Sequence, residues 1–225
     1  MNKVTTVQEA AKLVKTGMTV MVGGFGGIGT PNHLIEEICN SDTDQLEIIA
    51  DDFSPNHLGP YTMGLARFLK TGTANRGKMT FLGTNSDALR MLQTGELTIE
   101  YIPQGTFIER IHAGGTGLGG FYTPTGVGTE VAEGKETRVI NGREYLFEEP
   151  LTADVALLKV WRADTMGNCQ MLYTAKTFNL EMAMASETVI VEAEEIVEPG
   201  ELDPSFIHIP GVFVDYIVDG KEVIL

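Results

Sequence analysis

The sequence has few cysteines and no long hydrophobic run. Its 225 residues include two cysteines, Cys39 and Cys169, which lie far apart and lack CxxC spacing. They can build neither a disulfide scaffold nor a zinc knuckle, so we expect no metal site and a reducing, cytoplasmic compartment. No apolar run approaches the roughly 18 residues of a membrane span. The amino terminus has no apolar stretch before a cleavage site, which argues against a secretory signal.

Basic residues are also scarce. Lys and Arg number 16 against 31 Asp and Glu, which gives a formal charge of −15. Such a chain repels phosphate backbones and anionic lipid, so we expect neither nucleic acid nor a membrane surface as its partner. The composition, 43% hydrophobic and 21% charged, indicates a folded protein. The length suits one substantial core, and we expect a single domain over residues 1–225.

Familiar catalytic motifs are missing. The sequence has no Gly-x-Ser-x-Gly elbow, no P-loop lysine motif and no His-Glu-x-x-His. Its four histidines are scattered and are expected to be structural or solvated. Cys39 falls late in a predicted helix, where the helix dipole disfavours a thiolate. Either the protein binds without catalysis, or another chain completes its site.

Helix and strand signals alternate along the chain. Thr6-x-x-Glu9 is a capping box for a helix that Gly17 closes, and residues 18–22 read as a buried strand. Thr30 and Pro31 can begin a second helix before a strand at 46–50. Further strands are expected at 155–160, 188–191 and 212–218, with a helix at 181–185 and no assignment for 55–76. We predict an open three-layer α/β/α sandwich with a mostly parallel or mixed sheet.

A glycine-rich turn lies between the first predicted strand and the second helix. It consists of Gly23, Gly24, Phe25, Gly26, Gly27, Ile28 and Gly29. Its backbone N–H groups and the helix start could hold a phosphate or carboxylate. Gly24-x-Gly26-x-x-Gly29 also fits the dinucleotide pattern, with Asp51 at the end of the next strand as the ribose-binding acid. Tight-turn packing alone is a third explanation.

Gln104 and a second glycine run form another candidate region. Thr106-x-x-Glu109 reads as a capping box, and Gln104 just before it could donate to a substrate carbonyl or bond its own loop. Five glycines within residues 114–120 predict a loop rather than a helix or strand. Asp51 and Asp52 follow a strand, where adjacent side chains point to opposite faces, so a shared-proton pair is not expected unless the backbone there is irregular.

Several segments together resemble the A (alpha) subunit of family I 3-oxoacid CoA-transferases, the acetate/butyrate–acetoacetate type. Residues 22–31 match its GGF-x-x-x-G-x-P signature. The other matching segments, in family order, are residues 103–106, 109–111, 113–115, 122–126, 128–129, 151–157, 164–168, 178–179 and 192–194.

The resemblance implies transfer of coenzyme A between a short-chain acyl-CoA and a free carboxylic acid by a ping-pong mechanism. The nucleophile would be a glutamate of a partner B subunit, not of this chain, within a heterotetramer or larger assembly. Coenzyme A would be a substrate, with no permanently bound cofactor. Residues 23–29 would take the family's CoA-binding role, and Gln104 would hold the thioester carbonyl.

Asp51 departs from the family pattern. Close relatives have an asparagine there, as a second donor near the carbonyl, whereas an ionised aspartate can only accept. Asp51 is therefore protonated, turned elsewhere, or recognises a hydroxyl or amine of the acyl group. The segment 55–76 also departs from the family. Acetate–acetoacetate specificity therefore does not follow from the resemblance.

Overall fold

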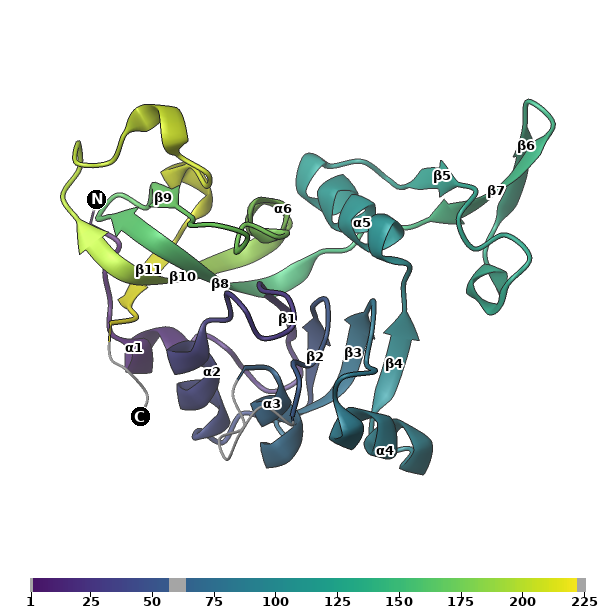
Figure 1. The fold of residues 1–225 in the computed structure, drawn as a ribbon, viewed down its shortest axis with the longest axis horizontal. Coiled ribbons are helices and arrows are strands. Elements are labelled where there is room, and N and C mark those ends of the chain that lie inside the picture. Colours follow the sequence, from purple (N-terminus) through teal and green to yellow (C-terminus); the bar gives the residue numbers. More distant parts are fainter. Residues whose placement is uncertain (1, 57–63, 222–225) are drawn as a thin grey trace.

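A computed structural model describes residues 2–56 and 64–221 and shows a parallel sheet between two layers of helices (Figure 1). The sheet has the order β11-β10-β8-β1-β2-β3-β4, and β9 pairs with β8. Every pairing along this order is parallel, and only β9 runs antiparallel. The strands are β1 (Thr19–Val22), β2 (Leu46–Ile49), β3 (Ala74–Met79), β4 (Thr98–Tyr101), β8 (Ala153–Asp164), β9 (Cys169–Gln170), β10 (Ser186–Val197) and β11 (Tyr216–Asp219).

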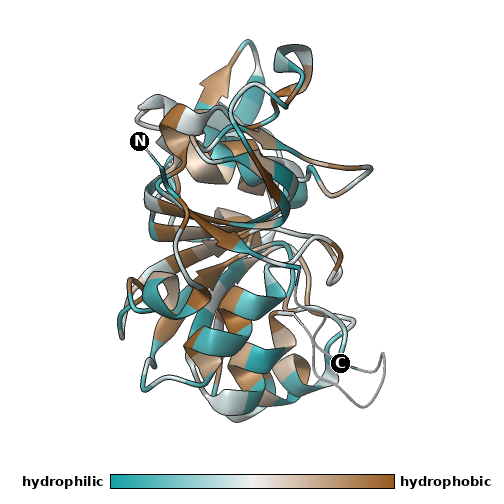
Figure 2. Ribbon diagram, turned by 90° about the vertical axis from the view of Figure 1, so that its left-hand side faces the viewer, coloured by the Kyte–Doolittle hydropathy of each residue, from teal (hydrophilic) through white to brown (hydrophobic). Residues whose placement is uncertain are grey.

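Successive side chains of the strands supply two separate cores. Val20 and Val22 of β1 join one cluster, and Met21 between them joins the other, as the alternation of a strand requires. Figure 2 shows the strands through the middle of the molecule as largely hydrophobic. The first cluster packs under α1 (Val7–Ala11), α2 (Asn32–Cys39), α3 (Ala66–Thr71) and α4 (Ser86–Thr94), and the second under α5 (Gln104–Thr116) and α6 (Asn179–Met184). The predicted α/β architecture is confirmed.

Local predictions near the amino terminus are partly correct. The Thr6 hydroxyl accepts a hydrogen bond from the Glu9 N–H, so the first predicted cap is confirmed, but α1 ends at Ala11 and not at Gly17. Thr30 does not cap α2, because its hydroxyl donates to the Gly27 carbonyl at 3.1 Å and contacts Asn32.

The predicted strand at 212–218 is shorter than expected: it begins at Tyr216, after a 3-10 turn over Gly211–Phe213.

The prediction of a loop at residues 114–120 is wrong for its first part. Helix α5 continues to Thr116, and Gly117 ends it with a φ of +74°. A Cβ on Gly114 would lie 2.1 Å from the Leu151 carbonyl oxygen, and one on Gly115 would lie 2.6 Å from the Cβ of Met184. These glycines allow α5 to approach its neighbours closely, which outweighs their poor helix propensity. Thr106 likewise lies inside the first turn of α5 and does not begin it.

A small antiparallel sheet projects from the body beyond α5 (Figure 1). It contains β5 (Phe121–Thr123), β6 (Thr137–Ile140) and β7 (Arg143–Glu148) in the order β5-β7-β6. Tyr122 and Phe147 pack on each other across it, with ring centroids 5.3 Å apart. None of its strands was predicted. Within the described ranges, no helix is long and apolar enough to cross a membrane.

Candidate active site at the glycine turn

The glycine-rich turn after β1 folds into a tight hairpin. Phe25 and Ile28 exchange two backbone hydrogen bonds, each 3.0 Å long. Gly26 and Gly27 between them have φ values of +57° and +86°, which glycine adopts without the strain of other residues. The turn therefore lifts the Phe25 and Ile28 side chains into solvent, where they are 51% and 65% exposed.

Several N–H groups of this turn are already used within the protein. Gly23 donates to the Leu157 carbonyl of β8, and Gly26 donates to Oδ2 of Asp52 at 2.8 Å. Those of Phe25 and Ile28 close the hairpin. The turn consequently offers fewer donors to an anion than its sequence suggests, and a carboxylate lies against it. Its prominent feature is the pair of exposed apolar side chains, Phe25 and Ile28.

Asp51 and Asp52 interact with each other, in the irregular backbone that is the exception to the expected opposite orientation. The chain leaves the regular strand after Ile49, and Ser54 has a φ of +59°. Asp52 Oδ1 accepts a hydrogen bond from the Ser54 N–H. The pKa of Asp51 is raised from 3.8 to about 6, chiefly because burial desolvates the carboxyl group. The charge and side-chain hydrogen bond of Asp52 act in the same direction, and the hydrogen bond from Thr80 opposes them.

Asp51 is bonded directly to Gln104, the first residue of α5. Gln104 Nε2 donates to Asp51 Oδ1 at 3.0 Å, and the Thr80 hydroxyl donates to the same oxygen at 2.9 Å. A carboxylate accepts only, so it fixes which end of the Gln104 amide faces it. The amide has a second N–H that remains for another acceptor. The structure thus brings together two predicted site residues that lie 53 positions apart in the sequence.

A cavity of about 300 Å³ lies between this glutamine and the glycine turn. It is lined by Phe25, Ile28, Gln104, Thr174, Thr177 and Phe178. Phe107 of α5 supports the cavity wall through an edge-to-face contact with Phe178, with ring centroids 5.6 Å apart. Asp51 is not among the lining residues and lies behind Gln104. A larger hollow of about 690 Å³ between α1 and α2 contains none of the predicted site residues.

Asn179 joins the glycine turn to the segment that forms the other side of the cavity. Its buried Nδ2 donates to the carbonyls of Lys159 and Ala175. A Cβ on Gly23 would lie 2.2 Å from its Oδ1, and one on Gly29 would lie 3.1 Å from the Cβ of Ala175. Glycine at both positions allows the turn and this segment to meet. Asn179 belongs to one of the matching family segments, but its role was not predicted.

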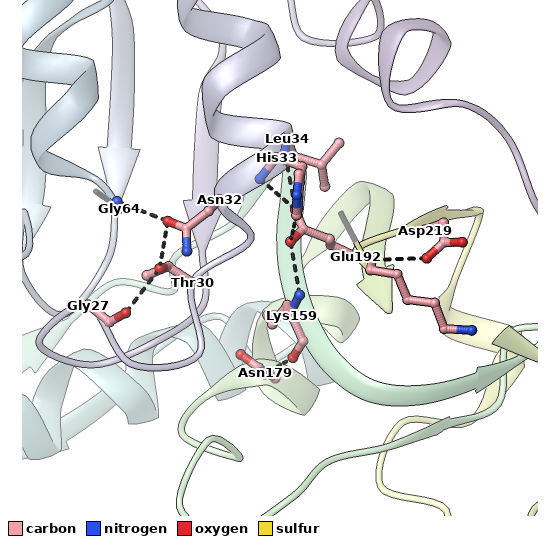
Figure 3. A network of polar contacts seen from close by, with 11 residues as sticks. Gly27, Thr30, Asn32, His33, Leu34, Gly64, Lys159, Asn179, Glu192 and Asp219 are labelled. Atoms are coloured by element: carbon pink, nitrogen blue, oxygen red, sulfur yellow. Dashed lines mark hydrogen bonds and ion pairs between the residues drawn. The ribbon is translucent and has the colours of Figure 1, made fainter. Parts of the chain in front are cut away.

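The start of α2 is fixed by a buried carboxylate from β10 (Figure 3). Glu192 accepts hydrogen bonds from the His33 and Leu34 N–H groups at 3.0 and 3.1 Å. Its other oxygen lies 3.0 Å from Lys159 Nζ and 3.0 Å from His33 Nδ1. An anion at this position complements the helix dipole and satisfies N–H groups that lack a partner within the helix. Glu192 therefore takes the capping role expected of Thr30.

Among the described residues, the remaining cysteine and histidine candidates do not line the cavity, and His57 lies outside the described residues. Burial raises the pKa of both thiols, Cys39 and Cys169, which makes them poor nucleophiles. His208 Nδ1 accepts a hydrogen bond from the Met171 N–H, and His33 is bonded to Glu192. In the part of the chain that the structure describes, no group of three His, Cys, Asp or Glu side chains is placed to hold a metal ion.

Comparison with known proteins agrees with this geometry. A family model described as coenzyme A transferase matches residues 4–220. The chain belongs to the coenzyme A transferase family. The resemblance inferred from the sequence motifs is confirmed, and the dinucleotide-binding alternative gains no support: Asp51, its proposed ribose ligand, is bonded to Gln104 and Thr80.

Two curated relatives are A or alpha subunits of CoA-transferases. The chain is 45% identical to the A subunit of the probable succinyl-CoA:3-ketoacid coenzyme A transferase of Bacillus subtilis, with 96% of this chain and 88% of that protein covered. It is 42% identical to the alpha subunit of the acetate CoA-transferase of Escherichia coli K12, with 98% of each covered. These names imply a partner B subunit.

A solved CoA-transferase shares the fold. The acyl-CoA transferase of Escherichia coli O157:H7, in a thioester complex with CoA, superposes with a TM-score of 0.84 at 19% sequence identity. The alignment covers 99% of this chain and 48% of that structure, so this chain spans about half of its length. At this identity the likeness concerns the fold alone.

Proposed function

We propose that this chain is the A subunit of an enzyme that moves coenzyme A between a short-chain acyl-CoA and a free carboxylic acid. The observation that carries the proposal is the cavity between the glycine turn and Gln104. Its lining includes an amide that can donate to a substrate carbonyl and the apolar side chains of Phe25 and Ile28. The six lining side chains include no carboxylate, thiol or imidazole to attack a thioester. A nucleophilic glutamate of the partner B subunit supplies that group.

The reaction then divides between the two chains. The glutamate carboxylate attacks the thioester carbonyl, which releases the CoA thiolate and leaves an acyl-glutamyl anhydride. The thiolate next attacks the glutamyl carbonyl, which releases the original acid and leaves a glutamyl-CoA thioester. The acceptor acid reverses both steps. The second N–H of Gln104 donates to the thioester carbonyl oxygen as negative charge develops there.

The glycine turn takes the part of the CoA-binding loop. Its apolar side chains, Phe25 and Ile28, suit the acyl group and the pantetheine arm better than a phosphate. Asp52 beneath the turn and the −15 charge of the chain both disfavour phosphate there. Cationic contacts to the phosphates of coenzyme A therefore come partly from the B subunit.

Reconstitution tests the proposal. The purified chain, its cognate B subunit and their mixture are each assayed for transfer of CoA from butyryl-CoA to acetate, with acetyl-CoA measured by chromatography. We expect turnover from the mixture only. Robust turnover by this chain alone, free of its partner, would overturn the division of roles.

A further inference from the structure

The lining of the cavity between the glycine turn and Gln104 favours one class of substrate. All six lining side chains are uncharged: three are apolar or aromatic, two are threonines and one is Gln104. Resting on the function proposed above, we infer that this site takes short acyl groups whose tails carry no charge and discriminates against acyl-CoAs of dicarboxylic acids such as succinyl-CoA. The names of the related proteins do not decide this, because they include a succinyl-CoA and an acetate enzyme.

A second carboxylate on the acyl tail would find no cation in this wall. Lys176 is the basic residue closest in sequence to the lining threonines, Thr174 and Thr177, but it does not line the cavity. Its charge acts on His208, whose pKa it helps to lower after desolvation. His208 lines a different groove, together with Trp161 and Phe206. The cavity lining itself thus offers no cation to a charged acyl tail.

Two buried carboxyl groups lie next to the cavity. Asp51 lies directly behind Gln104, and Asp52 lies against the glycine turn through the Gly26 N–H. Both carboxyl groups are buried, at 3% and 7% exposure. An acyl carboxylate entering beside them would lose its hydration and meet like charge, and both effects disfavour its binding.

The size of the cavity favours short tails. Its volume of about 300 Å³ lies at the lower end of the roughly 300–1,000 Å³ range of small-molecule sites. Phe25, Ile28 and Phe178 provide the apolar surface that a short acyl chain can cover. Apolar contact and the absence of a cation from the lining thus favour the same substrates.

The test compares two acyl donors in the assembled two-subunit enzyme. Initial rates are measured with butyryl-CoA and succinyl-CoA, each with acetate as the acceptor, to obtain kcat/KM for both. We expect butyryl-CoA to be preferred at least tenfold. Equal or greater use of succinyl-CoA would overturn the inference while leaving the transferase function intact. Absence of turnover with every donor would instead contradict the proposed function.

A charge placed in the wall gives an independent test. Thr174 is exposed at the cavity, so Thr174→Lys adds a cation there, and Thr174→Met adds similar length without charge. We expect the lysine variant to raise the succinyl-CoA to butyryl-CoA ratio of kcat/KM at least tenfold over the methionine variant. Equal ratios in the two variants would contradict the inference, because the acyl tail would then not lie beside residue 174.

Discussion

Asp51 stands where the resemblance predicts an asparagine, and an exchange of one side-chain atom there would alter the chemistry around it. Asparagine and aspartate can both accept from Thr80 and Gln104, so the contact to Gln104 survives the exchange. They differ toward Asp52, since asparagine has a permanent N–H and aspartate has a hydrogen only when protonated. That Asp51 departs from the family pattern stays a prediction from the sequence. The convergence of Asp51 and Asp52 could not be predicted, because it depends on the backbone after Ile49 and on the positive φ of Ser54.

Replacing Asp51 with asparagine should stabilise the chain above pH 6. The pKa of Asp51 is raised from 3.8 to about 6, so the folded state holds this proton more tightly than the unfolded chain does. That contribution is complete below pH 3.8 and is lost as the pH rises through 6. We expect Asp51→Asn to raise the free energy of unfolding by on the order of 1–3 kcal/mol at about pH 8, and by almost nothing at about pH 4.

Urea denaturation of wild type and variant at both pH values measures this difference. Asp42→Asn on the exposed surface is the matched control and should change stability by less than about 0.5 kcal/mol at either pH. A stability gain of the same size at both pH values would contradict the assigned role of the Asp51 proton.

Gln104→Ala should slow the assembled enzyme without preventing assembly. Loss of one carbonyl donor costs roughly 2.7–4 kcal/mol in a closed site, so we expect turnover to fall by about two to three orders of magnitude. Gln93→Ala, on the exposed face of α4, is the control and should keep wild-type turnover. Steady-state rates and size-exclusion chromatography of the complex measure both properties. Unchanged turnover in Gln104→Ala would reduce its role to the bond with Asp51.

At the scale of elements, features that depend on nearby residues could be predicted from the sequence. The β1–α2–β2 unit follows from the apolar runs and from Pro31, and the structure has it with parallel strands. The start of α2 was assigned to Thr30 because a cap is expected next to its helix. Glu192, 158 residues from Leu34, takes that position. A local pattern cannot reveal such a partner, since the strand order determines which residues meet.

Glu192→Gln should destabilise the chain strongly. Lys159 Nζ, on a side chain that is 15% exposed, would lose its charged partner, and the N–H groups at the start of α2 would lose an anionic acceptor. Breaking a buried ion pair costs roughly 3–5 kcal/mol. Glu194→Gln, at an exposed position two residues along the same strand, should cost less than about 0.5 kcal/mol. Equal losses in chemical denaturation would show that Glu192 does not anchor the helix.

At the scale of the whole molecule, the negative charge of the chain explains why it would need a partner to bind the phosphates of coenzyme A. A chain with a formal charge of −15 is a poor platform for the phosphates of coenzyme A. It nonetheless has a cavity with uncharged walls, which include the Gln104 amide, and a projecting three-stranded sheet (Figure 1). That another chain completes the catalytic set stays a prediction from the sequence. The shape of the cavity could not be predicted, because its walls come from segments 25–28, 104 and 174–178, which meet only in the fold.

Affinity for coenzyme A should consequently depend on assembly. We expect isothermal titration calorimetry to show at least tenfold weaker binding of CoA to this chain alone than to the complex with its B subunit. The physical reason is that the complex adds the cations that this chain has in short supply. Equal affinity would mean that this chain holds the phosphates without help.

Intact-mass spectrometry after acyl-CoA treatment tests the central claim, that the covalent step occurs on the partner while this chain builds the site around the acyl group. The assembled enzyme is incubated with butyryl-CoA, quenched in acid and separated into its two polypeptides. We predict that the B subunit gains the mass of coenzyme A, less one water, as a glutamyl thioester, and that this chain keeps its unmodified mass. A CoA adduct on this chain, with its partner unmodified, would contradict the claim.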